Sequence, residues 1–198
     1  MIVPVSAIIP CFNSEKTIKR ALESVKSQTA QVIEVICIDD NSSDFTLELI
    51  KNFTLENPEL LIHIIENKVN RGPGNSRNYG WDLATGDYIA FLDADDAWDE
   101  NKIAIQHSWM IAHPDIIMSG HSHFIYKKDC YQSIIDNEIE PNAETISKLS
   151  ILTKNPFVTP SIMLKRELSY RFKNDKRYCE DQLLCSEIVL NGNKVSCH

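Results

Sequence analysis

The segment Gly86-Asp87-Tyr88-Ile89-Ala90-Phe91-Leu92-Asp93-Ala94-Asp95-Asp96 decides the fold prediction for this chain. Residues 88–92 are mostly apolar and predict a buried strand, and carboxylates follow at once at Asp93 and Asp95. Side chains two residues apart in an extended segment point the same way, so both carboxylates can face one site. The segment therefore predicts an acidic site at the carboxyl end of a buried strand.

Working outward, the same order of apolar strand and amphipathic helix repeats along residues 1–113. The expected strands are 5–10, 32–38, 61–65 and 88–92, and the expected helices are 14–28, 43–53, 75–84 and 101–112. The second helix is expected to place Phe45, Leu49, Ile50 and Phe53 on one buried face. Four alternating units predict an α/β fold, with a doubly wound, mostly parallel sheet and helices on both faces.

After residue 115 the alternation weakens, but no linker or internal repeat interrupts the chain. We expect strands at 116–126 and 161–165 and helices at 144–152 and 181–190. A chain of 198 residues with 43% apolar residues can bury one sizeable core. The sequence therefore predicts a single domain over 1–198.

Composition narrows the function classes. The net charge of −8 opposes nonspecific binding to a nucleic-acid backbone, although a divalent cation can still bridge an acidic protein to a nucleotide. The six cysteines are scattered without a C-x-x-C pair, which indicates reduced thiols. No stretch approaches the roughly 20 apolar residues of a membrane span, and no signal peptide is recognisable. We therefore expect a cytoplasmic protein.

In doubly wound sheets, ligands bind beyond the carboxyl ends of the strands. Three loops meet this condition here: Pro10-Cys11-Phe12-Asn13, the acidic segment 39–44, and Asp93-Ala94-Asp95-Asp96. Carboxylates on adjacent loops suit Mg²⁺ or Mn²⁺, which protein sites often hold with one or two carboxylates plus substrate phosphates. Taken singly, each acidic loop is equally explained as a helix cap.

The combination of motifs is more specific than any one of them. In order along the chain they are Val5-Ser6-Ala7-Ile8-Ile9-Pro10-Cys11-Phe12-Asn13, Ile38-Asp39-Asp40-Asn41-Ser42-Ser43-Asp44, Arg77-Asn78-Tyr79-Gly80, the segment 84–96, and Glu180-Asp181. Together they closely resemble family 2 glycosyltransferases of the GT-A fold, which are inverting enzymes, and the likeness is greatest to bacterial members. The chain lacks the Gln-x-x-Arg-Trp sequence of processive relatives, so addition of a single sugar is expected.

The resemblance implies a metal-dependent hexosyltransferase that uses a nucleoside diphosphate sugar, with UDP as the expected nucleotide. It implies nucleotide and donor binding by Pro10, Phe12, Asp39, Asp40, Arg77 and Asp93. It also implies that Asp95 holds Mn²⁺ or Mg²⁺, and that Asp181 is the general base.

The expected acceptor is a glycan or a lipid-linked sugar of surface polysaccharide or lipooligosaccharide synthesis, met at the inner face of the membrane. Residues 1–113 would form the half that binds the nucleotide sugar, and 114–198 the acceptor side. Relatives usually continue beyond the helix that carries Asp181, so two alternatives stay open: an acceptor side truncated at the C-terminus, or a minimal member of the family.

Other interpretations stay open on the sequence alone. A sugar-phosphate nucleotidyltransferase has a similar sheet, but its first loop is normally glycine-rich and basic, unlike Pro10-Cys11-Phe12-Asn13. A phosphoacceptor receiver domain places its acidic pair after the first strand, whereas here the pair follows the second. A nucleotide-sugar-binding module without transfer activity is the third alternative. His121 and His123 share a strand face but lack the third ligand typical of zinc, and Trp98 is a candidate for sugar contact.

Overall fold

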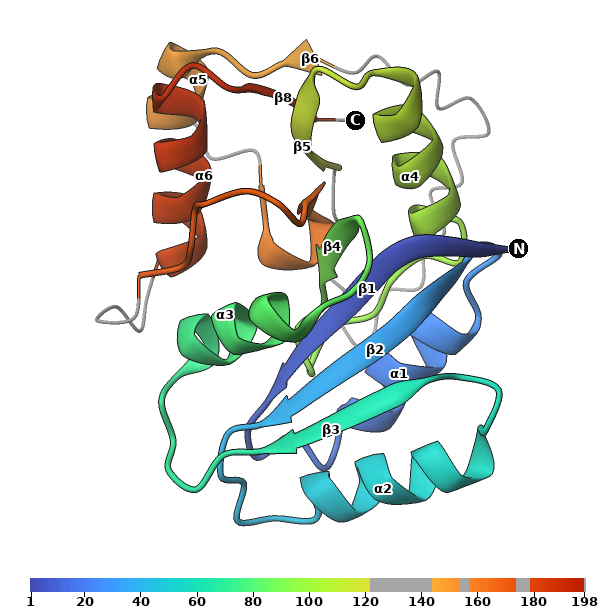
Figure 1. The fold of residues 1–198 in the computed structure, drawn as a ribbon. Coiled ribbons are helices and arrows are strands. Elements are labelled where there is room, and N and C mark those ends of the chain that lie inside the picture. The colour runs from blue at the N-terminus through green and yellow to red at the C-terminus, as the bar shows by residue number, and fades with distance from the viewer. Residues whose placement is uncertain (122–143, 154–156, 174–178, 198) are drawn as a thin grey trace, which may run out of the picture.

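The computed structural model describes residues 1–121, 144–153, 157–173 and 179–197. Its first half is the predicted parallel sheet (Figure 1), built from β1 (Ile2–Cys11), β2 (Gln31–Asp39), β3 (Ile62–Glu66) and β4 (Tyr88–Phe91). These strands lie in the order β3-β2-β1-β4 and all pair in parallel. The fold class expected from the sequence is confirmed.

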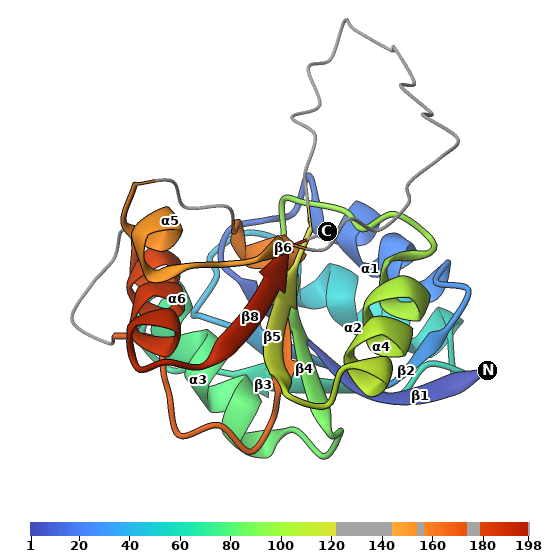
Figure 2. The same ribbon diagram turned by 90° about the horizontal axis from the view of Figure 1, so that it is seen from above.

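Helices cover both faces of the sheet, as the alternating units predict. The first four are α1 (Ile18–Lys26), α2 (Thr46–Glu56), α3 (Pro73–Leu83) and α4 (Lys102–Ala112). Viewed from above, α1, α2 and α4 lie on one side of the strands and α3 lies on the other (Figure 2). The two layers enclose two separate clusters of buried apolar side chains.

The alternation within β1 explains the two cores. Val5, Ala7 and Ile9 pack with the α1, α2 and α4 side, whereas Ile8 packs with the α3 side. Successive strand residues point to opposite faces, so a strand buried on both sides must be apolar nearly throughout. The close approach of α3 requires Gly80, because a Cβ there would lie 2.7 Å from Ile8 Cγ2.

The second half extends the sheet with strands of mixed direction. They are β5 (Ile116–Gly120), β6 (Glu144–Thr145), β7 (Met163–Lys165) and β8 (Lys194–Cys197). In the described part of the chain the sheet has eight strands in the order β3-β2-β1-β4-β7-β5-β8-β6. β7 pairs antiparallel with both β4 and β5, so it joins the two halves into one sheet.

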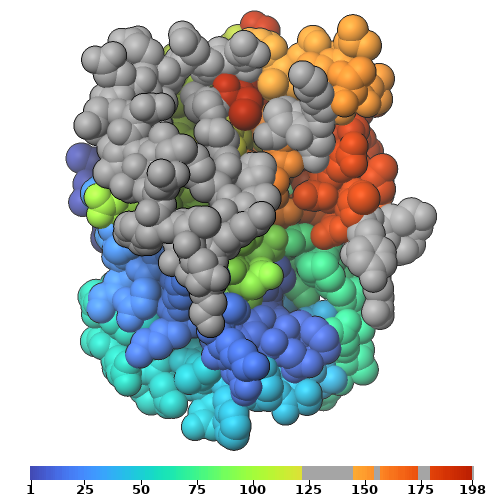
Figure 3. Space-filling model, turned by 180° about the vertical axis from the view of Figure 1, so that it is seen from behind, coloured from blue at the N-terminus to red at the C-terminus, as the bar shows by residue number. Residues whose placement is uncertain are grey.

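The remaining helical segments are α5 (Lys148–Thr153), the 3-10 turn η1 (Thr159–Ser161) and α6 (Glu180–Leu190). α5 and α6 pack on the α3 side of the sheet, where Ile151, Leu184 and Ile188 join its core. In the view from behind, the blue and cyan N-terminal units form the lower part, with α5 and α6 above them at one side (Figure 3).

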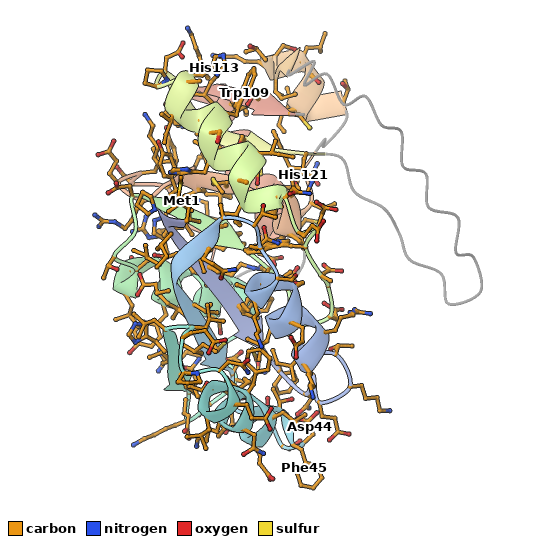
Figure 4. All side chains as sticks on the ribbon, turned by 90° about the vertical axis from the view of Figure 1, so that its right-hand side faces the viewer. Met1, Asp44, Phe45, Trp109, His113 and His121 are labelled. Atoms are coloured by element: carbon orange, nitrogen blue, oxygen red, sulfur yellow. The ribbon has the colours of Figure 1, made fainter. Side chains whose placement is uncertain are left out.

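Three sequence-based expectations need correction or limits. Phe45 precedes α2 and is 66% exposed, so it does not belong to the buried helix face (Figure 4). The segment 144–152 is not one helix, because β6 and then α5 occupy it. The strand expected at 116–126 is confirmed only as β5, since residues 122–126 and His123 lie outside the described residues, and β8 was not predicted.

Two further sequence expectations concern cysteines and membranes. Cys11, Cys37, Cys179 and Cys185 form no disulfide among the described residues, and Cys130 lies outside them, so the reduced state of the thiols stays a prediction. Within those same ranges, each helix is too short or too polar to cross a bilayer.

Candidate active site

The predicted donor-binding residues gather in one cleft at the carboxyl edge of the parallel strands. The cleft has a volume of about 940 Å³. Among the sequence-predicted residues that line it are Pro10, Phe12, Asp40, Arg77, Asp93 and Asp95. The strand pairing explains this convergence, because Cys11 lies beside Asp39 in the sheet and the loops after β1 and β2 therefore begin together.

Arg77 lies at the centre of a buried ion cluster beneath the cleft. Its Nη2 donates to Asp93 Oδ1 at 2.5 Å, and its Nη1 donates to Glu180 Oε1 at 2.8 Å. The neighbouring carboxylates raise the pKa of Arg77 against the opposing effect of burial. Arg77 therefore ties the loop after β4 to the start of α6, 103 residues further along the chain. Glu180 has this role without having been predicted as a site residue.

Asp93 is affected electrostatically by Asp95, two residues away, and by Asp181 at the start of α6. Burial raises the pKa of Asp93, the Arg77 guanidinium lowers it, and the negative charges of Asp95 and Asp181 raise it further, for a net upward shift. Asp181 does not line the cleft in the way that Asp93 and Asp95 do, but its charge acts on Asp93. Asp181 therefore lies within electrostatic range of Asp93, and its part in the site stays a prediction.

Asp181 lies in the first turn of α6 and is held at both carboxylate oxygens. Its Oδ2 accepts a hydrogen bond from Thr159 Oγ1 at 3.2 Å, and its Oδ1 accepts one from the backbone N–H of Gln182 at 2.7 Å. Nothing in the sequence marks Thr159, a hydroxyl residue before a proline, as part of this site. Only the folded position of η1 next to α6 makes the contact visible.

Asp40 is buried and organises the loop that leads into α3. Asn67 Nδ2 donates to its Oδ1 at 2.8 Å, and the backbone N–H of Gly72 donates to its Oδ2 at 2.7 Å. The N–H of Arg71 donates to both oxygens. Gly72 has φ +87°, which favours glycine at this turn. Asp40 therefore fixes the wall of the cleft at the start of α3.

Asp39 lies behind the cleft and does not line it. Ser42 N–H donates to its Oδ2 at 3.2 Å, whereas its buried Oδ1 has no hydrogen-bond partner among the described residues. A buried, unpartnered carboxylate oxygen is rare and usually has a functional or water-mediated explanation. Both carboxylate oxygens of Asp40 therefore accept hydrogen bonds from the protein, whereas Asp39 Oδ1 could still accept one.

The loops after β1 and β2 are bound to each other at the cleft rim. Asn13 N–H donates to Ser42 Oγ at 3.0 Å, and Asn13 Oδ1 accepts from the N–H of Ser43 at 2.9 Å. Asp44, labelled in Figure 4, accepts from the N–H groups of Glu15 and Thr46, which lowers its pKa although burial acts the other way. The rim therefore carries negative charge at neutral pH.

Asp95 is the residue whose surroundings best suit a divalent cation. It is exposed at the cleft, and its carboxylate makes no hydrogen bond to another described residue, while Arg20 donates to its backbone carbonyl. Across the described ranges, no cluster of three or more potential metal ligands occurs. One free carboxylate beside a cleft fits Mg²⁺ or Mn²⁺ only if substrate phosphates complete the shell, which is common for these ions.

The two secondary candidates from the sequence fall away from the cleft. Trp98 is 7% exposed and its Nε1 donates to Pro160 O at 2.9 Å, so it packs inside the protein and is not a free sugar platform. For zinc, His123 lies outside the described residues, and His121 belongs to no cluster of ligands among the residues described.

A family model for glycosyl transferase family 2 matches residues 6–171, which include the second half of β1, the acidic loops and η1. The chain belongs to glycosyl transferase family 2. Among curated relatives, it is 31% identical over 189 residues to a UDP-Glc:alpha-D-GlcNAc-diphosphoundecaprenol beta-1,3-glucosyltransferase of Escherichia coli, covering 96% of this chain and 71% of the relative. It is also 30% identical to an uncharacterized glycosyltransferase of Haemophilus influenzae, over 82% of this chain and 62% of that one.

Solved structures share the fold of this family 2 chain. TarS residues 1–349 of Staphylococcus aureus, solved also with UDP, superpose with a TM-score of 0.78 at 24% identity, over 98% of this chain and 57% of TarS. A mannosyltransferase of Pyrobaculum calidifontis, solved with GDP-Man and Mn²⁺, gives 0.74 at 18% identity, over 98% of this chain and 56% of that one. The chain thus spans somewhat more than half of each of these proteins.

Proposed function

We propose that this chain binds a nucleoside diphosphate sugar through Mn²⁺ or Mg²⁺ and transfers the sugar, with inversion, to an acceptor hydroxyl. The observation that carries the proposal is the meeting of acidic residues from distant segments at one cleft. Asp40, Asp93 and Asp95 line it, and the charge of Asp181 acts on Asp93. A cation bound in such a cleft would strengthen the binding of a diphosphate, because carboxylates and phosphates repel each other.

In the proposed reaction Asp181 is the general base. The acceptor hydroxyl oxygen attacks the anomeric carbon from the face opposite the diphosphate, and its proton passes to the Asp181 carboxylate. The new carbon–oxygen bond forms as the bond to the phosphate oxygen breaks, so the nucleoside diphosphate leaves with the bonding electrons. A base must lie within hydrogen-bond reach of the proton it takes, and Asp181 is on the α6 side of the acidic cluster.

The other cleft residues are assigned to donor binding. We assign Pro10, Phe12 and Asp40, which line the cleft, to the nucleoside, and Asp93 to the ribose or sugar. Asp39, which does not line the cleft, would support the nucleoside from the adjacent position. The role proposed for Arg77 is to hold Asp93 in place, since both ends of its guanidinium are already bound. Asp95 would hold a divalent cation, which would neutralise the charge that develops on the leaving diphosphate.

The names of the relatives suggest the substrates. The Escherichia coli relative is named for UDP-glucose and a diphosphoundecaprenol acceptor, and TarS was solved with UDP. For the present chain we therefore propose UDP as the nucleotide and a glycan or lipid-linked sugar as the acceptor. A lipid-linked acceptor is presented at a membrane surface, so transient contact of the enzyme with the inner face of the membrane forms part of the proposal.

A donor screen followed by one substitution tests this function. UDP-, GDP- and dTDP-sugars are compared, with and without Mn²⁺, for their effect on the unfolding temperature, because a ligand bound only by the folded state raises apparent stability. Release of the nucleoside diphosphate from the best donor, which we expect to be UDP, is then measured with water as the acceptor. We expect Asp181→Asn to bind that donor normally and to lower UDP release by about 10²–10⁴-fold.

The outcomes separate the proposed enzyme from the alternatives. Donor binding without UDP release by the unsubstituted chain would indicate a binding module. Binding of a nucleoside triphosphate with release of pyrophosphate would indicate a nucleotidyltransferase. Undiminished turnover in Asp181→Asn would remove Asp181 from the mechanism.

A further inference from the structure

The contacts of η1 carry an inference that rests on the proposed function and goes beyond it. We propose that Thr159 is a positioning residue for the base Asp181, and that Trp98 and Gln106 hold Thr159 in place. The turn η1 would then fix the position of the helix that carries Asp181 relative to the loop that carries Asp95. Thr159 does not touch the reacting atoms in this proposal.

The first step is the contact between the two side chains. Thr159 is 5% exposed, and its Oγ1 donates to Asp181 Oδ2 at 3.2 Å. The other oxygen, Oδ1, is bound by the N–H of Gln182. With both oxygens held, the carboxylate keeps one orientation relative to α6. A base that is misplaced by about 1 Å can lose up to about 10²-fold in rate, so this orientation matters.

The second step is the attachment of η1 to the rest of the fold. The indole Nε1 of Trp98 donates to Pro160 O at 2.9 Å, and Gln106 Nε2 donates to Ser161 O at 2.9 Å. Trp98 lies only three residues after Asp95 and is 7% exposed. The turn is therefore bound on one side by the segment following the proposed metal residue and on the other by α4.

The third step concerns Lys102, which determines how Gln106 is oriented. Lys102 Nζ donates to Gln106 Oε1 at 2.6 Å and lies 4.6 Å from the centre of the Trp98 ring. With Lys102 donating to the amide oxygen, the amide nitrogen of Gln106 is left to donate to Ser161 O. Lys102 thereby supports both residues that hold η1.

The test compares substitutions within the same turn. Thr159→Val keeps the β-branched shape but removes the hydroxyl, and Thr159→Ser keeps the hydroxyl. Ser161→Ala is the matched control, because Ser161 Oγ donates to Val158 O at 2.8 Å within the turn and not to Asp181. UDP release from UDP-glucose with Mn²⁺ and water as acceptor gives kcat and donor KM, and calorimetry gives donor affinity.

We expect Thr159→Val to lower kcat by about 10-fold or more while donor KM and affinity change less than about twofold. Thr159→Ser should restore most of the rate, and Ser161→Ala should leave it within about twofold. Trp98→Phe keeps the ring but removes the indole donor, so a smaller loss of kcat with unchanged donor affinity is expected. Thr159→Ala replaces Thr159→Val if thermal unfolding shows that the valine variant does not fold.

Several results overturn the inference. They are an unchanged kcat without the Thr159 hydroxyl, an equal loss in Ser161→Ala, failure of Thr159→Ser to restore the rate, and an unaffected Trp98→Phe. Asp181→Asn in the same assay keeps the two proposals apart. If it remains active, the proposed base is wrong; if it is inactive while Thr159→Val is unimpaired, only the positioning role is wrong.

Discussion

Arg77 and Lys102 are two buried basic side chains with different surroundings. Arg77 is 4% exposed and is bound by two carboxylates, which raise its pKa. Lys102 is 5% exposed, and its recorded contacts within the described residues are a neutral amide and an indole ring. Burial lowers the pKa of Lys102 to about 7.

The difference separates two kinds of support. Arg77 lies between the buried carboxylate of Glu180 and the partly buried carboxylate of Asp93, and its removal would leave both without their cation. An ammonium group beside neutral partners can lose its proton and still form a hydrogen bond. We therefore expect the contribution of Arg77 to the free energy of unfolding to depend on its charge. The contribution of Lys102 should change with pH.

The largest effect is expected from Arg77→Met. Removing one partner of a buried ion cluster leaves Asp93 and Glu180 without their cation, which costs about 3–5 kcal/mol in the free energy of unfolding. Denaturant titration followed by circular dichroism measures this change. Arg77→Lys is the control, because it keeps the charge but cannot bind both carboxylates through a planar fork. Its free energy of unfolding should lie between those of the original chain and Arg77→Met. A decrease of less than about 1 kcal/mol in the free energy of unfolding of Arg77→Met would contradict the proposed dependence of Asp93 and Glu180 on the Arg77 charge.

A smaller effect is expected at Lys102, as a slope of the free energy of unfolding against pH. Between pH 7 and the ordinary lysine pKa of 10.5, the folded protein has released the Lys102 proton while the unfolded chain keeps it. The unfolded state then binds more protons, so stability rises with pH, by up to about 1.4 kcal/mol per pH unit. Lys102→Met should lack this rise.

The slope is measured from the free energy of unfolding at several pH values between 7.5 and 9.5, in the original chain and in Lys102→Met. The difference between the two proteins should grow steadily with pH. Parallel curves would mean that Lys102 keeps its proton in the folded protein, and the contrast with Arg77 would be lost.

The smallest effect is expected from an ion pair that is equally close but exposed. Lys51 Nζ lies 2.7 Å from Glu66 Oε1, and the two side chains are 51% and 52% exposed. Solvent screens such pairs, so Lys51→Ala should change stability by less than about 1 kcal/mol. A cost as large as that of Arg77→Met would show that burial does not decide the contrast.

The donor side could be predicted from the sequence because it follows the topology of a parallel sheet. Strands with apolar alternation place Pro10, Asp40 and Asp93 at the ends of β1, β2 and β4, and parallel pairing brings these ends together. Strand recognition and one general rule on ligand position were enough to find this side of the cleft.

The surroundings of Asp181, formed by α6 and η1, could not be predicted in the same way, because they depend on long-range contacts that leave no local sequence pattern. β7 inserts antiparallel between β4 and β5, which no strand periodicity announces. Glu180 and Thr159 act through partners 103 and 22 residues away in the chain. The burial of Trp98 follows from the same packing, and the sequence alone could not separate it from a sugar-contact role.

Calorimetric titration of UDP, with and without Mn²⁺, tests the central proposal most directly. We expect Mn²⁺ to raise the affinity of the original chain for UDP by at least about tenfold, because the cation bridges Asp95 and the diphosphate. That gain should disappear in Asp95→Ala, while binding without metal stays the same. Equal affinity with and without Mn²⁺, or a full gain in Asp95→Ala, would contradict a metal-bridged donor at this cleft.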